Sequence, residues 1–220
     1  MIDIHDNKIE EQVRFSGMGD ASCDKYLIER LRFCKKRTPN LDLVVLSNMS
    51  GWKKTMSDCV INEGLLRKIR FSIFAVTEEF SEEEYGNKSQ AGVARKAIEY
   101  FIEKNDMAGK PVDTLMYTLS TDKNKDELDR IKEVYWDAVD EFEVWSPHSW
   151  SNRMKELRPV QKSRRICPMV ESFSASIRVN GDVCPCSLDI NHDIVYGNLK
   201  DQTIMEVFNS DNYKKLRDMN

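Results

Sequence analysis

The chain has 220 residues, of which 40% are hydrophobic and 32% are charged, and its formal net charge is −4. These values are typical of a globular protein large enough for one domain plus a small module. The negative charge and the dispersed Lys and Arg residues give no basis for nucleic-acid binding. No apolar run approaches the roughly 18 residues of a membrane span, and no secretory signal pattern is visible. We therefore expect a cytoplasmic protein with reduced thiols and with neither a membrane nor a nucleic-acid partner.

Strand-like and helix-like segments alternate from residue 12 to residue 145. Five segments are predicted to be strands: 12–16, 41–46, 68–76, 112–119 and 142–145. Helices are predicted between them, from Ser22 or Asp24 to Cys34, weakly around 58–66, over an apolar stripe at 93–102, and over 123–138. The charged stretch 78–84 is expected to be solvated. This order predicts an α/β fold of five parallel strands, with the chemistry at their carboxyl ends.

The cysteines point to a second, smaller unit. Three of the six, Cys167, Cys184 and Cys186, lie within twenty residues. An Asn-Gly pair at Asn180-Gly181 predicts a hairpin that brings Cys184 and Cys186 back towards Cys167. Thiolates bind iron–sulfur clusters and zinc, and both remain open. The nearest candidate for a fourth ligand is His192, although a surface-loop histidine explains it better.

The other three cysteines show no metal-ligand spacing, and Cys34 lies on the apolar stripe of its helix, where it is expected in the core. After the hairpin, a turn at Gly197-Asn198 precedes two predicted helices, at 203–210 and 211–217.

This C-terminal stretch resembles the opening of the SPASM domain, the auxiliary-cluster module of many radical S-adenosylmethionine enzymes. The resemblance rests on the spacing Cys167-x13-Gly181-x4-Cys186 and on Pro185. It continues in Gly197-Asn198-Leu199, Ile204-x2-Val207-Phe208-Asn209-Ser210 and Leu216-Arg217. It implies that Cys167, Cys184 and Cys186 help to hold an auxiliary [4Fe–4S] cluster.

The upstream strands and helices resemble the partial βα barrel of the same enzymes. Gly17-Met18-Gly19-Asp20 stands where that family has a Gly-Gly-Glu-type loop for the methionyl amino group of S-adenosylmethionine, with Asp20 in place of the Glu. Ser47-Asn48 stands where the family often has Thr-Asn-Gly, and Ser72 falls near its polar position for the cofactor carboxylate or ribose. The resemblance therefore implies a cofactor site formed by Gly17, Gly19, Asp20, Ser47, Asn48 and Ser72.

In such a barrel, Arg14 and Arg70 would face the lumen as candidates for binding a carboxylate or phosphate. His148, which follows the last predicted strand, is a candidate general acid or base. A loop histidine flanked by packing tryptophans explains it at least as well.

The sequence also departs from the family pattern. It contains no Cys-x3-Cys-x2-Cys loop for the radical-generating cluster, and it ends without the later cysteines of a full SPASM domain. We therefore expect a partial barrel lacking its first unit over 1–150, a linker over 151–166 and an incomplete SPASM-like module over 167–220.

The resulting hypothesis is a fragment of a radical S-adenosylmethionine enzyme that generates a 5′-deoxyadenosyl radical and modifies a peptide or small molecule. An electron-donor protein is an expected partner, and this chain alone is expected to be inactive in that reaction. The alternative is a catalytically inactive binding protein with a structural metal or iron–sulfur site.

Overall fold

The computed structural model describes residues 12–17, 19–147 and 174–218. These residues fall into two structural units, one within Glu10–Ser146 and one that includes Pro147–Asn220. Cys167, His148 and the predicted linker lie outside the described residues, so the predictions made for them are not addressed by the structure.

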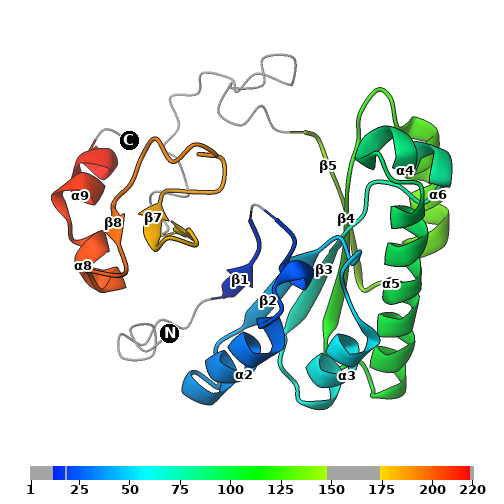
Figure 1. Ribbon diagram of the computed structural model, residues 1–220, viewed down its shortest axis with the longest axis horizontal. Coiled ribbons are helices and arrows are strands. Elements are labelled where there is room, and N and C mark those ends of the chain that lie inside the picture. Colours follow the sequence, from blue (N-terminus) through cyan, green and yellow to red (C-terminus); the bar gives the residue numbers. More distant parts are fainter. Residues whose placement is uncertain (1–11, 18, 148–173, 219–220) are drawn as a thin grey trace. The chain divides into compact units, whose positions relative to one another are not determined.

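The larger unit is built on a five-stranded parallel sheet in the order β1-β2-β3-β4-β5 (Figure 1). Its strands are β1 (Val13–Phe15), β2 (Leu43–Ser47), β3 (Lys68–Ser72), β4 (Asp113–Leu119) and β5 (Glu141–Trp145). Its helices are η1 (Ala21–Cys23), α2 (Leu27–Arg37), α3 (Lys54–Asn62), α4 (Glu78–Tyr85), α5 (Ser89–Met107) and α6 (Lys125–Tyr135). The predicted α/β fold with five parallel strands is therefore confirmed.

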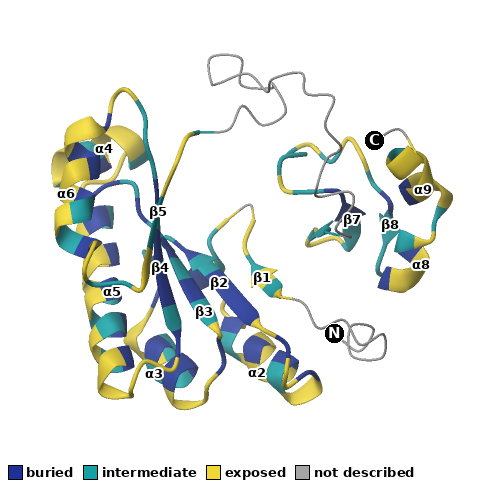
Figure 2. Cartoon of the chain, turned by 180° about the vertical axis from the view of Figure 1, so that it is seen from behind, coloured by how far each residue is buried: buried dark blue, intermediate teal, exposed yellow. Residues whose placement is uncertain are grey.

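The helices lie against one face of the sheet, and the hydrophobic core forms between them (Figure 2). On β3, Ile69 and Phe71 point into this core and are fully buried, while Arg70 and Ser72 alternate to the other face. The rings of Phe71 and Phe101 meet edge to face at 5.7 Å, which joins β3 to α5. Such packing of a helix stripe on a sheet face is the main source of stability in this architecture.

Three segments differ from the sequence-based expectation. The helix expected weakly around 58–66 forms earlier, over Lys54–Asn62. The charged stretch 78–84 forms a helix of its own, α4, because Thr77 caps its first turn and Gly86 ends it in the left-handed conformation at φ +63°. Its glutamates are exposed, as expected. Strand β3 ends at Ser72 rather than at Val76. Ile73 still donates to Tyr117 of β4, but the Val76 and Thr77 amides donate to the carboxylate of Glu127 instead of to a neighbouring strand.

Hydrogen bonds between Thr114 and Asp140 connect the starts of β4 and β5. The Asp140 carboxylate accepts hydrogen bonds from the backbone N–H of Thr114, at 2.8 Å, and from its hydroxyl, at 2.7 Å. Burial alone would raise the pKa of Asp140, but these two donors outweigh it and hold the pKa below its ordinary value of 3.8.

The smaller unit holds a three-stranded antiparallel sheet in the order β6-β7-β8, followed by two helices. Its elements are β6 (Ser176–Ile177), β7 (Asp182–Cys184), β8 (Gly197–Asn198), α8 (Ile204–Phe208) and α9 (Asp211–Asp218). Gly181 adopts φ +94° in the turn between β6 and β7, which confirms the predicted Asn-Gly hairpin. A small core of Val183, Tyr196, Ile204, Val207 and Tyr213 packs the helices on the sheet.

Among the helices that the structure describes, none combines the length and apolar character needed to cross a lipid bilayer.

Candidate cofactor cavity and cysteine hairpin

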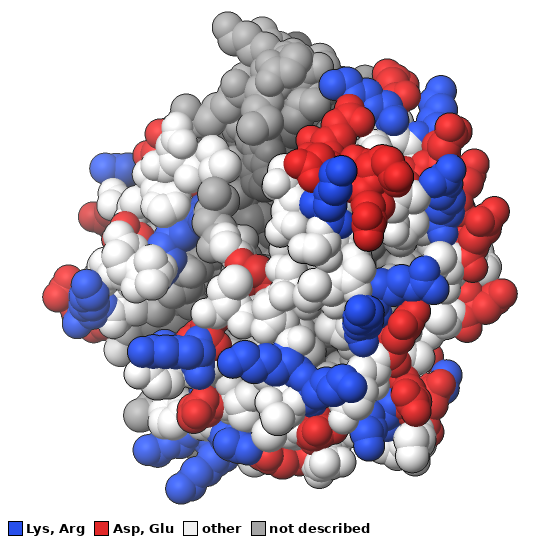
Figure 3. Space-filling view, turned by 45° about the vertical axis from the view of Figure 1, so that its right-hand side comes forward, with Lys and Arg blue, Asp and Glu red and all other residues white. Residues whose placement is uncertain are grey.

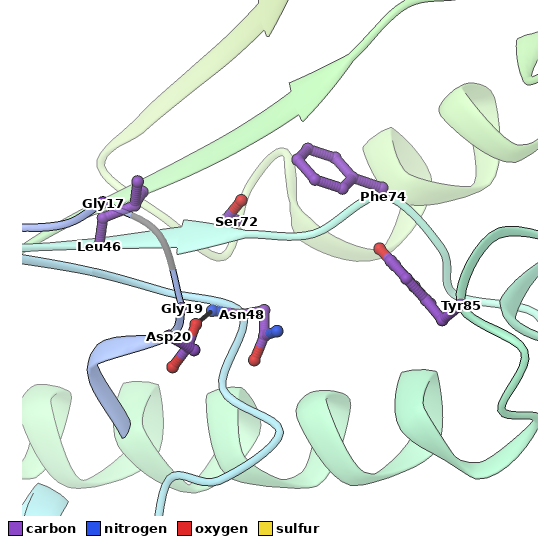
Figure 4. Close-up of a pocket in the computed structure, with 8 residues that line it drawn as sticks. All are labelled: Gly17, Gly19, Asp20, Leu46, Asn48, Ser72, Phe74 and Tyr85. Carbon is purple, nitrogen blue, oxygen red and sulfur yellow. Dashed lines mark hydrogen bonds between the residues drawn. The ribbon is translucent and has the colours of Figure 1, made fainter. Parts of the chain in front are cut away.

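A cavity of about 280 Å³ lies at the carboxyl ends of β1, β2 and β3 (Figure 4). Its volume is close to the lower end of the range for small-molecule sites. The residues that line it are Gly17, Gly19, Asp20, Leu46, Asn48, Ser72, Phe74 and Tyr85. Five of the six residues predicted to bind a cofactor are in this set. The sixth, Ser47, is buried and donates a hydrogen bond to Asp20 at 2.8 Å.

The Asp20 carboxylate organises this end of the sheet. Its Oδ1 accepts from the backbone N–H of Ser22 at 2.8 Å, from the Ser22 hydroxyl at 2.6 Å and from the Ser47 hydroxyl. Its Oδ2 accepts from the backbone N–H of Asn48 at 2.5 Å, so the loop after β1 is fastened to the end of β2. Three of these four donors reach Oδ1 and one reaches Oδ2, so Oδ2 is the less fully used oxygen of a residue that lines the cavity.

Gly17 and Gly19 have φ values of +138° and +87°. A methyl group added at either Cα would meet no atom within 4 Å, so space does not select glycine here. The backbone angles are what favour glycine at both positions, since L-residues with side chains rarely adopt these angles. The loop can thus turn sharply from β1 into η1 and present its backbone to the cavity.

Phe74 and Tyr85 form the opposite side of the cavity from Gly17 and Asp20 (Figure 4). Sequence analysis did not identify either residue. Burial raises the pKa of the Tyr85 hydroxyl, although a hydrogen bond with the backbone of Phe74 opposes this effect. The hydroxyl therefore stays protonated and links α4 to the segment that follows β3.

Glu127 holds the same segment from α6, and it was also missed from the sequence. Its buried carboxylate accepts from the backbone N–H of Val76, from the backbone N–H of Thr77 at 2.7 Å and from the Thr77 hydroxyl at 2.9 Å. The available signal was a charged residue on the apolar stripe of a helix, four residues before Ile131. A carboxylate in that position needs donors, and here they come from a loop about 50 residues earlier in the chain.

The sheet face opposite the helices carries charged and aromatic side chains. Arg70 pairs with Glu143 at 2.6 Å, and its guanidinium lies 5.8 Å and 5.7 Å from the ring centres of Tyr117 and Trp145. Arg14 donates to Gln12 at 2.8 Å. Burial and the nearby charge of Arg70 lower the pKa of Arg14, while Glu143 opposes them.

The Arg70 guanidinium is already paired with Glu143, and the expectation that Arg14 and Arg70 bind an anion stays a prediction. In the view of Figure 3, basic and acidic side chains lie among one another over the surface of the described residues.

In the smaller unit, Cys184 ends β7 and is fully buried, and Cys186 lies two residues later with partial exposure. Burial raises the pKa of the Cys184 thiol, and the neighbouring Arg178 opposes this shift. His192 lies in the following loop at φ +60°. No group of three metal-binding side chains occurs among the described residues, a set that excludes Cys167. Cys34 is in the core of the larger unit, as predicted.

Comparisons with known proteins found a family match for the C-terminal residues and solved structures with a similar fold. Residues 167–220 match the SPASM family, an iron–sulfur cluster-binding domain. No curated protein matches the chain in sequence.

Among solved structures, BtrN in complex with AdoMet and 2-DOIA is 15% identical at a TM-score of 0.60, over 99% of this chain and 69% of BtrN. A histidine-tagged form of anSMEcpe with bound AdoMet is 11% identical at a TM-score of 0.69, over 98% of this chain and 71% of anSMEcpe. Native anSMEcpe with bound AdoMet and the Kp18Cys peptide is 12% identical at a TM-score of 0.64, over 94% of this chain and 69% of that chain.

At these identities the structural likeness shows the fold, a partial βα barrel, and the family match supplies the C-terminal domain. Residues 167–220 therefore match the SPASM domain, and the chain shares the fold of the solved structures named above.

Proposed function

We propose that this chain is the part of a radical S-adenosylmethionine/SPASM enzyme that binds the cofactor and an auxiliary [4Fe–4S] cluster. The observation that carries the proposal is the cavity at the ends of β1, β2 and β3. There the glycine loop, the Asp20 carboxylate and Ser72 lie together, as the resemblance to a cofactor site requires. To supply a radical, the bound cofactor would have to receive one electron from a radical-generating [4Fe–4S] cluster, for which this chain has no Cys-x3-Cys-x2-Cys loop. It would then break into methionine and a 5′-deoxyadenosyl radical that abstracts hydrogen from a substrate.

Each side of the cavity suits a different part of S-adenosylmethionine. Asp20 Oδ2 accepts one hydrogen bond from the chain where Oδ1 accepts three, and it is the oxygen proposed to accept from the methionyl ammonium group. The Ser72 hydroxyl can donate to the carboxylate or to a ribose oxygen. Phe74 and Tyr85 offer aromatic surface for the adenine, on the side away from Asp20. The amino acid and nucleoside ends would thus be held by opposite walls.

Cys184 and Cys186 would hold the auxiliary cluster together with Cys167. Two features of the hairpin fit such a group. The Cys184 sulfur is removed from solvent, and a buried Arg178 N–H beside it has no acceptor among the described residues. An iron–sulfur cluster is bound by thiolates and is shielded and hydrogen-bonded by its surroundings in this way.

We propose a peptide or a small molecule as the substrate. We also propose an electron-donor protein as a partner. The similar structures support both substrate classes. One anSMEcpe structure contains a peptide and the BtrN structure contains 2-DOIA.

A second candidate, a binding protein without radical chemistry, is favoured by one observation. All four donors on Asp20 come from its own chain, so the loop after β1 is complete without a ligand. In that case the cysteines would hold zinc or a cluster for structure only.

The two candidates differ in metal content and in cofactor binding. After anaerobic reconstitution with iron and sulfide, the first predicts a brown protein with broad absorption near about 400 nm. It also predicts S-adenosylmethionine binding in equilibrium dialysis, weakened several-fold in Ser72→Ala. Ser89→Ala, at an exposed position on α5, is the matched control. A colourless zinc protein that binds no S-adenosylmethionine would contradict the proposal and support the second candidate.

A further inference from the structure

Arg178 lies in the hairpin that carries Cys184. In the register of this hairpin, Ser176 is opposite Cys184 and the backbone N–H of Arg178 donates to the Asp182 carbonyl at 2.8 Å. Side chains two residues apart in a strand share a face of the sheet. Arg178 and Cys184 therefore project from the same face of the hairpin, on neighbouring strands.

The Arg178 guanidinium is only partly used by the described residues. Its Nη2 donates to the backbone carbonyl of Asp189 at 2.9 Å, which ties the loop after Cys186 to the hairpin. Its Nε is buried and has no acceptor within the part of the chain that the structure describes. Buried cationic donors are normally paired with an acceptor or an anion, because leaving one unpaired costs free energy.

Cys184 lies on the same face of the hairpin as this guanidinium, and its sulfur becomes an anionic acceptor when it binds a metal centre. The Arg178 side chain lies within hydrogen-bonding reach of this sulfur. Metal binding deprotonates a thiol, and an iron–sulfur cluster with thiolate ligands carries net negative charge. A guanidinium on the same face would then gain the partner that its Nε lacks.

We propose that Arg178 is a positioning residue of the auxiliary centre, donating a hydrogen bond to a sulfur at Cys184 and raising the reduction potential of the cluster. The inference rests on the proposed function, since it needs a cluster at these cysteines. Hydrogen bonds to sulfur and nearby positive charge stabilise the reduced, more negative form of a cluster, which fixes the sign of the effect.

Three variants of the full chain separate charge from hydrogen bonding. Arg178→Gln removes the charge and keeps a short N–H donor. Arg178→Lys keeps the positive charge but replaces the planar guanidinium, with its fixed N–H donors, by an ammonium group. Lys200→Gln removes one exposed charge from the same unit and is the matched control, because solvent and salt screen it.

The measurement is a redox titration of the reconstituted protein followed by electron paramagnetic resonance, with iron and sulfide content determined in parallel. We expect a lower midpoint potential in Arg178→Gln, a smaller decrease in Arg178→Lys, and no shift in Lys200→Gln. An unchanged potential in a fully loaded Arg178→Gln would overturn the role of Arg178. Failure of the wild-type chain to take up iron and sulfide would instead contradict the proposed function.

A variant that loses the cluster is also informative when the metal-free protein is compared by circular dichroism and thermal melting. Loss of iron from Arg178→Gln with the metal-free protein still folded as in the wild type supports the proposal. Loss of iron together with an unfolded hairpin would show that Arg178 stabilises the unit rather than the centre, and the proposal would be wrong.

Discussion

The substitution Asp20→Asn tests whether this carboxylate organises the cofactor cavity. Asparagine has the same shape but replaces one acceptor oxygen with an NH₂ donor. The least damaging placement keeps the amide oxygen at Oδ1, where three donors converge from Ser22 and Ser47. The NH₂ group then faces the backbone N–H of Asn48, which at present donates to Oδ2 at 2.5 Å.

The expected cost follows from the bonds that are lost. A hydrogen bond to a charged group contributes about 1.5–3 kcal/mol, and an unpaired N–H adds a penalty when it is buried. Asp20 and Asn48 are partly exposed, so water offsets some of that penalty. We therefore expect Asp20→Asn to lower the free energy of unfolding by about 2 kcal/mol. The acceptor proposed for the methionyl ammonium is lost as well, so S-adenosylmethionine binding should weaken in parallel.

Urea unfolding followed by tryptophan fluorescence measures the first effect, because Trp52, Trp136 and Trp145 belong to the larger unit. With an m value of about 2 kcal/mol/M, the midpoint should fall by about 1 M. Asp24→Asn is the control. Its carboxylate pairs with an exposed Arg30, so its effect should stay below about 1 kcal/mol. Equal midpoints for Asp20→Asn and the wild type would refute the reasoning.

Three further predictions concern other parts of the chain. Glu127→Gln should loosen the segment after β3 and weaken S-adenosylmethionine binding several-fold in equilibrium dialysis, whereas Glu133→Gln, exposed on the same helix, should not. Gly181→Ala should destabilise the hairpin by about 2 kcal/mol, because φ is +94° and the new methyl carbon would lie 2.6 Å from a side-chain oxygen. In contrast, Gly92→Ala within α5 should stabilise its unit by about 1 kcal/mol, and hydrogen exchange of the two segments would show whether the signs are opposite. The third is a pH dependence: because the folded pKa of Asp140 lies below 3.8, its stabilising contribution is complete above that value and is lost as the pH falls through the folded pKa. Asp140→Asn should therefore be less stable than the wild type in urea at about pH 7, and the difference should shrink as the pH falls below 3.8; a difference that persists undiminished at low pH would count against this explanation.

Much of the fold and of the candidate site could be predicted from the sequence. Strand and helix periodicity gave the order of elements, since alternation and 3.6-residue repeats report local burial directly. The rule that the carboxyl ends of parallel strands meet at one edge brought together Gly17, Asn48 and Ser72, which do line one cavity. The Asn-Gly pair predicted the hairpin because few other residues adopt the required backbone angles.

The tertiary structure alone decided which groups satisfy one another. Asp20 is bonded to the end of a strand 27 and 28 residues away, and Glu127 is bonded to a loop 50 and 51 residues away. No local pattern encodes such pairs, because a buried carboxylate takes whichever donors the packed chain brings to it. The same holds for Arg178, whose position beside Cys184 depends on the strand register. The sequence thus determined which elements form and where their ends meet, and only packing decided which polar groups hold the two candidate sites in shape.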